Sequence, residues 1–192
     1  MAKFAPQLIL ASRSPRRCQL LTEAGYQFTI QHPADAAECG ICSGESPPAY
    51  VARLAMQKAA DVTSRVDRGL ILGCDTVAEC QGQILGKPID EAHARRMLEL
   101  LSGREHRVYS GLCLWDHPTR PPRVEVAVTT LLMERLSSTQ LDDYLRSGLW
   151  EGKAGAFGYQ DRTGWLHVVD GSESNVVGLP MELLAQMLAE LA

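Results

Sequence analysis

The 192-residue sequence lacks any apolar run close to the roughly 20 residues that a membrane-spanning helix needs. The apolar stretch near its N-terminus, residues 8–10, is too short for a secretory signal. Basic residues are not in excess either, because 19 Lys and Arg stand against 23 Asp and Glu, for a formal net charge of −4. Since non-specific nucleic-acid binders normally carry a basic face, this balance argues against that class. We therefore expect a soluble, cytoplasmic protein with neither a membrane nor a nucleic acid as its partner.

The sequence also lacks the features of a disulfide scaffold. A chain of this length, with 45% hydrophobic and 22% charged residues, can bury enough surface to fold without disulfides or metals. We therefore expect its six cysteines to be reduced. Cys39 and Cys42 have the spacing of a zinc or redox pair, but no second ligand pair and no adjoining strand and helix accompany them. An incidental loop pair is favoured, with a zinc or redox function as the alternative.

Apolar patterning predicts strands and helices that alternate along the chain. Strands are expected over residues 7–11, 28–30, 70–74, 107–115 and 124–133, and helices over 15–25, 47–62, 91–101, 139–146 and 180–191. Residues 76–85 are typical of a hairpin, and the long irregular stretch 32–48 is interpreted as a functional loop. This alternation predicts an α/β domain with a mixed sheet.

The first predicted strand leads directly into a helix whose start is rich in hydroxyl and guanidinium groups. Ser14 is a suitable N-cap and Pro15 a suitable first helical residue. Ser12, Arg16 and Arg17 lie around this helix N-terminus, where free N–H groups attract anions such as phosphate. The alternative is an ordinary capped surface helix with solvated arginines.

Asp75 follows the predicted strand 70–74, and Thr76 and Lys87 come soon after it. If this strand and the first one are parallel neighbours, both motifs face the same crevice at the carboxyl ends of the strands. An acid and a base in one local unit fit phosphoryl chemistry, although an aspartate after a strand can also be a simple turn residue.

Two further polar residues stand in unusual surroundings. Lys58 falls on the apolar stripe of helix 47–62, so its ammonium either reaches the solvent at the helix edge or meets an anion in a cleft. Gln160 ends a Gly-rich segment and can donate and accept at one planar edge, which suits a nucleobase. The alternative for that segment is a twisted strand packed on its neighbour.

Over nearly its whole length the chain resembles the Maf-like nucleoside triphosphate pyrophosphatases. The matching motifs are Leu10-Ala11-Ser12-x-Ser14-Pro15-Arg16-Arg17, Val51-x-Arg53-Leu54-Ala55-x-x-Lys58-Ala59, Gly73-x-Asp75-Thr76-Val77, Gly86-Lys87-Pro88, Lys153-Ala154-Gly155-Ala156-Phe157 with Gln160, and Asn175-Val176-Val177-Gly178-Leu179-Pro180. The resemblance implies one domain over residues 1–192, with an elongated central mixed sheet flanked by helices, as in the inosine triphosphatase-like (Maf/Ham1-type) fold.

The resemblance also implies hydrolysis of a nucleoside triphosphate to the monophosphate and pyrophosphate, with a divalent cation (Mg²⁺, Mn²⁺ or Co²⁺). Its site residues follow from the matched positions. The implied catalytic residues are Asp75, as the proton acceptor, with Lys58 and Lys87, which act on the phosphates. Ser12 and Arg17 are implied to bind phosphate, and Arg16, Thr76 and Gln160 match the branch of the family that acts on dTTP and UTP. The implied metal ligands are Asp75 and Glu38.

Some functional questions stay open at this level. Modified nucleotides, and with them a role in cleaning the nucleotide pool, are compatible with the resemblance, and a homodimer is compatible with the sequence. The alternative function is a nucleotide-sensing regulator that binds without turnover, for example one that acts in cell division. Such a regulator would have no need for Asp75 together with Lys87, so their presence favours the enzyme.

Overall fold

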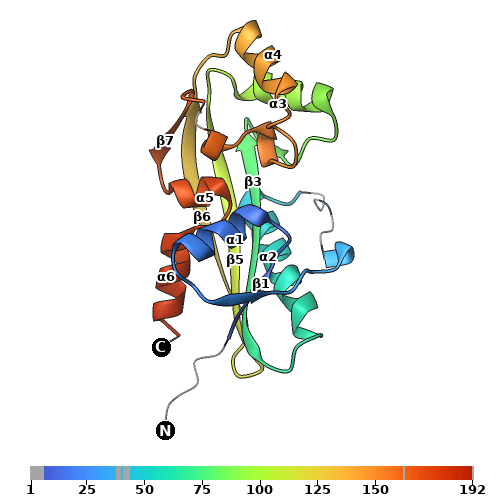
Figure 1. Ribbon diagram of the computed structural model, residues 1–192, viewed down its shortest axis with the longest axis vertical. Coiled ribbons are helices and arrows are strands. Elements are labelled where there is room, and N and C mark those ends of the chain that lie inside the picture. The colour runs from blue at the N-terminus through green and yellow to red at the C-terminus, as the bar shows by residue number, and fades with distance from the viewer. Residues whose placement is uncertain (1–6, 38–39, 41–43, 162, 192) are drawn as a thin grey trace.

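The computed structural model describes residues 7–37, 40, 44–161 and 163–191. Within these residues one seven-stranded mixed sheet runs in the order β2-β1-β3-β5-β6-β7, with β4 paired to β3 off this path. The strands are β1 Leu8–Ala11, β2 Phe28–Ile30, β3 Gly69–Cys80, β4 Gln83–Leu85, β5 Glu105–His117, β6 Arg123–Met133 and β7 Leu166–Asp170. β1 lies parallel to β2 and β3, whereas β5, β6 and β7 continue the sheet in antiparallel pairs. The molecule is elongated along the three long strands (Figure 1).

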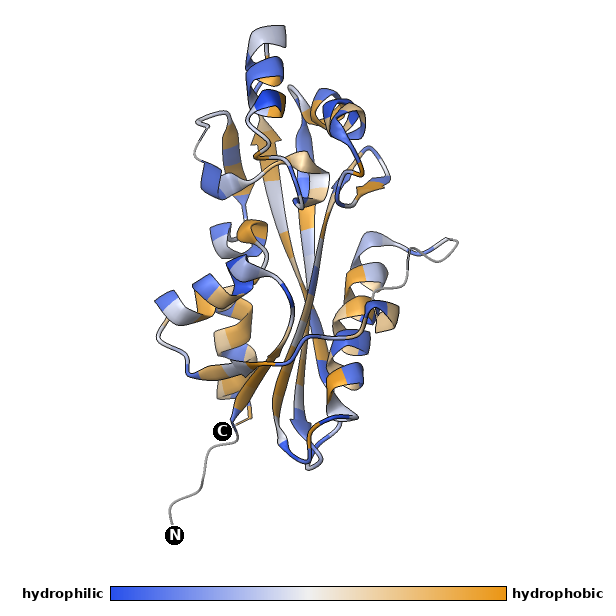
Figure 2. Cartoon of the chain, turned by 45° about the vertical axis from the view of Figure 1, so that its right-hand side comes forward, coloured by the Kyte–Doolittle hydropathy of each residue, from blue (hydrophilic) through white to orange (hydrophobic). Residues whose placement is uncertain are grey.

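Helices cover both faces of this sheet. They are α1 Pro15–Glu23, α2 Pro47–Thr63, α3 Glu91–Leu101, α4 Ser138–Arg146, α5 Glu173–Val177 and α6 Met181–Ala189. On one face α2 packs Ala55, Ala59 and Val62 against the strands. On the other face α1 and α6 contribute Leu21 and Leu184 to a second cluster. Figure 2 shows these helices on either side of the long strands, with hydrophobic segments in the strands between them.

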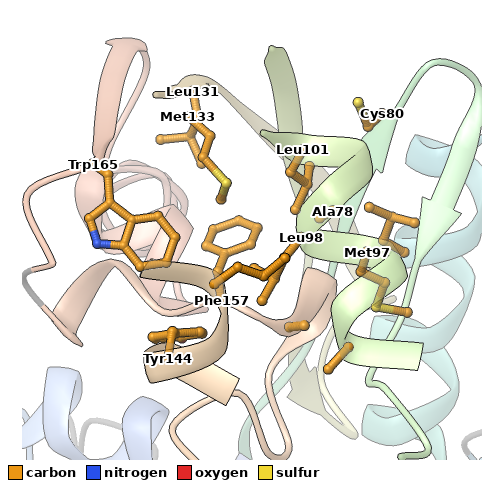
Figure 3. Close-up of a cluster of buried hydrophobic side chains, with 14 of the residues drawn as sticks. Ala78, Cys80, Met97, Leu98, Leu101, Leu131, Met133, Tyr144, Phe157 and Trp165 are labelled. Atoms are coloured by element: carbon orange, nitrogen blue, oxygen red, sulfur yellow. The ribbon is translucent and has the colours of Figure 1, made fainter. Parts of the chain in front are cut away.

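A third core cluster lies at the end of the sheet that is covered by α3 and α4, away from the two chain termini (Figures 1 and 3). Figure 3 shows Tyr144, Phe157 and Trp165 gathered with Leu98 of α3. The rings of Tyr144 and Trp165 meet edge to face with their centroids 5.2 Å apart, a favourable aromatic arrangement. The irregular segment around Phe157 is thereby fixed to a packed core.

Two glycines allow α2 to lie directly on the sheet. A Cβ on Gly73 of β3 would come within 2.1 Å of the carbonyl oxygen of Ala55. A Cβ on Gly111 of β5 would come within 2.2 Å of the carbonyl oxygen of Val51. Both distances are far below any real contact, so only glycine permits this approach of helix to strand. The close packing brings the side chains of α2 within reach of the polar residues of β3.

Most predicted elements are present, with three differences. The strand expected to end before Asp75 continues to Cys80, because β5 pairs alongside it as far as Glu79. Strand β7 and the short helix α5 were not among the predicted elements. Ser137, one residue before the expected Ser138, is the N-cap of α4 and forms a capping box with Gln140. Among the described residues, no helix is long and apolar enough to cross a membrane.

Candidate active site

The candidate site lies at a short unpaired edge of β3. Pairing with β1 ends where Ala11 faces Gly73, and pairing with β4 begins only at Ala78. Asp75 and Thr76 lie in the gap between these two partners and, as neighbours in a strand, point to opposite faces of the sheet. A cleft of about 390 Å³ opens along this edge. Asp75 and Thr76 are therefore accessible because β1 ends beside them. They do not lie at the end of β3, as the sequence pattern indicated.

On the α2 side of the sheet, Lys58 forms an ion pair with Asp75. The distance between Lys58 Nζ and Asp75 Oδ1 is 2.7 Å, and the side chains are only 5% and 14% exposed. Of the two alternatives for Lys58, the structure shows the meeting with an anion in a cleft. Removing Lys58 would take away the cation that faces the buried Asp75 carboxylate, so Lys58 fixes the place of this carboxylate.

On the opposite side, the buried guanidinium of Arg17 ties three segments together. Its Nε donates to the carbonyl oxygen of Gly178 at 2.8 Å, and its two terminal nitrogens donate to Ser12 Oγ at 3.1 Å and Thr76 Oγ1 at 3.2 Å. Thr76 is also hydrogen-bonded to Ser110 Oγ at 2.7 Å. Arg17 thus holds the floor of the cleft in shape, beyond any contact it makes with a phosphate.

The start of α1 forms one wall of the cleft. Ser12 Oγ accepts a hydrogen bond from the backbone N–H of Ser14 at 3.1 Å, whereas the Ser14 side chain makes no capping bond. Arg16 reaches across to the carbonyl oxygen of Gly152 at 3.2 Å. Burial and the neighbouring Arg17 lower the pKa of Arg16, so an anion bound here would relieve an electrostatic cost.

The opposite wall is built from two turns that are joined through their backbones. The N–H of Gly155 donates to the carbonyl oxygen of Gly86 at 3.0 Å, which brings the Lys87 turn against residues 153–160. Gly155 has a φ of +69°, a left-handed conformation that favours glycine. Both Lys87 and Gln160 are exposed and line the cleft.

The sequence of this chain is similar to those of a known protein family. A model of the family described as Maf-like protein matches residues 7–191. The chain belongs to the Maf-like protein family. A relative from Rhodopirellula baltica named dTTP/UTP pyrophosphatase is 58% identical, over 94% of this chain and 80% of the relative. A second relative with the same name, from Moorella thermoacetica, is 41% identical, over 95% of this chain and 94% of the relative.

Solved structures of Ham1 proteins share the fold of this Maf-like chain. The Staphylococcus aureus Ham1 protein matches with a TM-score of 0.57 and 12% identity, covering 97% of this chain and all of that one. A HAM1 protein from Coxiella burnetii matches with a TM-score of 0.52 and 16% identity, covering 96% and 99%. The family and the fold class that the sequence motifs indicated are thus both confirmed.

One cleft of this Maf-like chain brings together all the described residues that the motifs selected. They are Ser12, Arg16, Arg17, Lys58, Asp75, Thr76, Lys87 and Gln160. Glu38, Cys39 and Cys42 lie outside the described residues. No cluster of three or more metal-ligating side chains occurs in the part of the chain that the structure describes.

Sequence reasoning missed two charged residues of the Maf-like site. Lys153 lines the cleft, and its Nζ lies 2.5 Å from both carboxylate oxygens of Asp161. Lys153 belongs to one of the matching motifs, from which no role for it follows, and Asp161 belongs to none of them. The available signal was a lysine inside a segment of glycines and apolar residues, where an ammonium needs a partner.

Proposed function

We propose that this chain hydrolyses nucleoside triphosphates to the monophosphate and pyrophosphate, with a preference for dTTP and UTP. The observation that carries the proposal is the buried Lys58–Asp75 pair at the edge of a cleft with many basic groups. Relatives that are 58% and 41% identical over almost the whole chain are named for this activity. Formation of these products requires cleavage between the α- and β-phosphates.

The basic side chains of the cleft bind and orient the triphosphate. Arg16 and Lys87 approach from opposite walls, and Ser12 supplies a hydroxyl at the start of α1. Such a site works mainly by positioning and by stabilising the negative charge that develops on the leaving pyrophosphate. Arg17 acts differently, because it fixes Ser12 and Thr76 in place from beneath.

Asp75 accepts the proton of the attacking water in this proposal. Lys58 holds one carboxylate oxygen of Asp75, Oδ1, so the carboxylate has a fixed orientation toward the cleft. General-base catalysis of this kind typically contributes about 10²–10⁴-fold. A nucleotide sensor without turnover would not need a carboxylate oriented in this way, so the enzyme is preferred over the regulator.

The residues fit a divalent cation that binds together with the substrate. Mg²⁺ is commonly held by one or two carboxylates together with substrate phosphates and waters. Asp75 supplies one carboxylate in the cleft, and Glu38 is the second residue proposed for this role. When bound, the cation would neutralise phosphate charge as the anhydride bond breaks.

Base preference is assigned to Gln160, with Arg16 and Thr76. An amide offers one donor and one acceptor, which match the imide edge of uracil or thymine. A carboxylate in its place would favour donor edges. Gln160→Glu should therefore erode the preference for UTP over GTP, with about 1–3 kcal/mol at stake for each unmet hydrogen bond.

Release of pyrophosphate from a panel of triphosphates tests the proposal. UTP and dTTP should give higher kcat/KM than GTP and CTP in the presence of Mg²⁺ or Mn²⁺. Asp75→Asn should lose about 10²–10⁴-fold in kcat. Asp67→Asn, at an exposed aspartate just before β3, is the matched control and should keep full activity. Nucleotide binding without pyrophosphate release would establish the sensor instead.

A further inference from the structure

Lys153, which lines the cleft, forms a second buried ion pair with Asp161, and the reaction described above does not use this pair. The side chains of Lys153 and Asp161 are 9% and 5% exposed. Lys153 Nζ lies 2.5 Å from both oxygens of Asp161, and Tyr144 donates its hydroxyl to Asp161 Oδ2 at 2.7 Å. A buried ion pair of this kind is costly unless its hydrogen bonds are well made, so its place in the cleft requires an explanation.

This pair is attached to the rigid end of the molecule. Tyr144 belongs to α4 and packs in the third core cluster, edge to face with Trp165 (Figure 3). Burial and the hydrogen bond to Asp161 both raise the pKa of Tyr144, so its hydroxyl stays a donor at neutral pH. Asp161 is therefore held from the core by Tyr144 and from the cleft side by Lys153.

Gln160 shares a single turn with Asp161. Residues Tyr159–Asp161 form a short 3₁₀ turn, and Gln160 lines the same cleft as Lys153. A Cβ on Gly158 would lie 2.8 Å from Lys153 Nζ, 2.9 Å from Asp161 Oδ2 and 2.9 Å from Gln160 Nε2. The ammonium, the carboxylate and the amide thus surround one small space that only a glycine leaves open.

We propose that Lys153 and Asp161 are positioning residues for base selection: they hold the Gln160 turn in place and, as an ion pair, leave no unpaired charge of their own beside its amide. The inference rests on the proposed function, in which Gln160 reads the base. An unpaired carboxylate or ammonium beside this amide would add an electrostatic preference among bases to the hydrogen-bond geometry by which the amide discriminates a neutral uracil or thymine edge. Loss of Lys153 would leave a carboxylate there, and loss of Asp161 would leave an ammonium.

A pair of probe nucleotides can measure that charge directly. GTP and 7-methyl-GTP have nearly the same shape, but the methylated base carries a positive charge. The ratio of kcat/KM for 7-methyl-GTP to that for GTP therefore reports the electrostatic potential at the base. Lys153→Met should raise this ratio about tenfold, and Asp161→Asn should lower it. The double variant should return to within about threefold of the wild type.

Damage to the fold cannot produce this pattern, because two unspecific defects would not shift one ratio in opposite directions. Arg95→Met breaks an exposed ion pair with Asp142 near the same end of the molecule and is the matched control. It should leave the ratio unchanged. Shifts of the same sign in both single variants, or no shift in either of them, would overturn the proposal.

Gly158→Ala tests the positioning role without any change of charge, and it decides the matter if the charge variants do not fold. The three atoms nearest to the added methyl group are the ends of side chains and not backbone atoms, so the protein should fold while these ends are displaced. UTP/GTP selectivity should fall about tenfold, through KM for UTP rather than through kcat, while the 7-methyl-GTP/GTP ratio stays constant. Unchanged UTP/GTP selectivity in this variant would refute the inference.

The wild-type panel separates this inference from the proposed function. If wild-type protein shows no preference for UTP and dTTP over GTP, the assigned base preference is wrong, whatever the variants do. If the wild type has the preference and the variants of residues 153, 158 and 161 retain it, only the positioning role fails.

Discussion

The ammonium of Lys58 meets the carboxylate of Asp75 at 2.7 Å, where α2 crosses the middle of β3. The contact depends on Gly73, two residues before Asp75 on the same face of β3, because a side chain there would push the helix away. A backbone feature of the sheet thus determines the geometry of the proposed catalytic pair.

Replacement of Lys58 by methionine should impair turnover more than substrate binding. The buried carboxylate of Asp75 would lose its partner and its orientation, so kcat for UTP should fall on the order of 10²-fold. Steady-state kinetics of pyrophosphate release measure the effect. Arg65→Met, which breaks an exposed ion pair with Asp61 just beyond α2, should leave kcat unchanged. A loss confined to KM would instead assign Lys58 to substrate binding alone.

Gly73→Ala should destabilise the protein and misplace Lys58. The new Cβ would lie 2.1 Å from the carbonyl oxygen of Ala55, which is a backbone atom and cannot move without α2. We expect a loss of about 3 kcal/mol in the free energy of unfolding, measured by urea denaturation. Gly86→Ala is the control, because a Cβ there meets nothing within 4 Å and should cost little. Equal stability of the two variants would contradict the close packing of α2.

Arg17→Lys separates a structural role from simple charge. Lysine keeps the positive charge but cannot reach Ser12, Thr76 and the Gly178 carbonyl together through one planar group. Activity with UTP should fall about 10–100-fold, together with a loss of thermal stability. Arg13→Lys, at an exposed arginine of the same wall, should have little effect on either measurement. Full activity of Arg17→Lys would show that charge alone suffices at this position.

Local patterns were sufficient to predict much of this architecture. The apolar run of β1, the Pro15 helix start and the stripe that buries Lys58 all depend on residues close together in sequence. The parallel pairing of β1 with β3 was only a condition at the level of the sequence, and the structure shows that it is met. The proposed cleft could be located because, under this condition, both motifs face the same crevice at the carboxyl ends of the strands.

The exact place of Asp75 could not be predicted from local sequence. Its position at an open edge depends on where β1 stops beside β3 and where β4 begins, and both are set by pairing between distant segments. The Lys153–Asp161 pair was missed for a related reason, since an irregular segment has no periodicity that would reveal which side chains meet. Only Tyr144, from another helix, completes that network.

Stability should decrease in mildly acidic solution because of His106. This histidine is 3% exposed, and its Nε2 has no hydrogen-bond partner among the described residues. Burial lowers the pKa of His106 from 6.5 to about 4, although the Arg104 carbonyl opposes the shift. Between these two values the unfolded chain binds a proton that the folded protein excludes. The full contribution to stability is therefore present above about pH 6.5 and is lost as the pH falls toward 4, for a total of about 3 kcal/mol.

Urea denaturation at pH 7, 5.5 and 4.5 measures this dependence. Carboxylates also titrate in this range, so the comparison is between wild type and His106→Phe, which cannot take up the proton. The variant should lose less stability than the wild type as the pH falls, by about 1.4 kcal/mol per pH unit within the window. His167→Gln, at an exposed histidine beside Glu134, should follow the wild-type curve. Parallel curves for wild type and His106→Phe would mean that His106 is protonated as readily in the folded protein as in the unfolded chain.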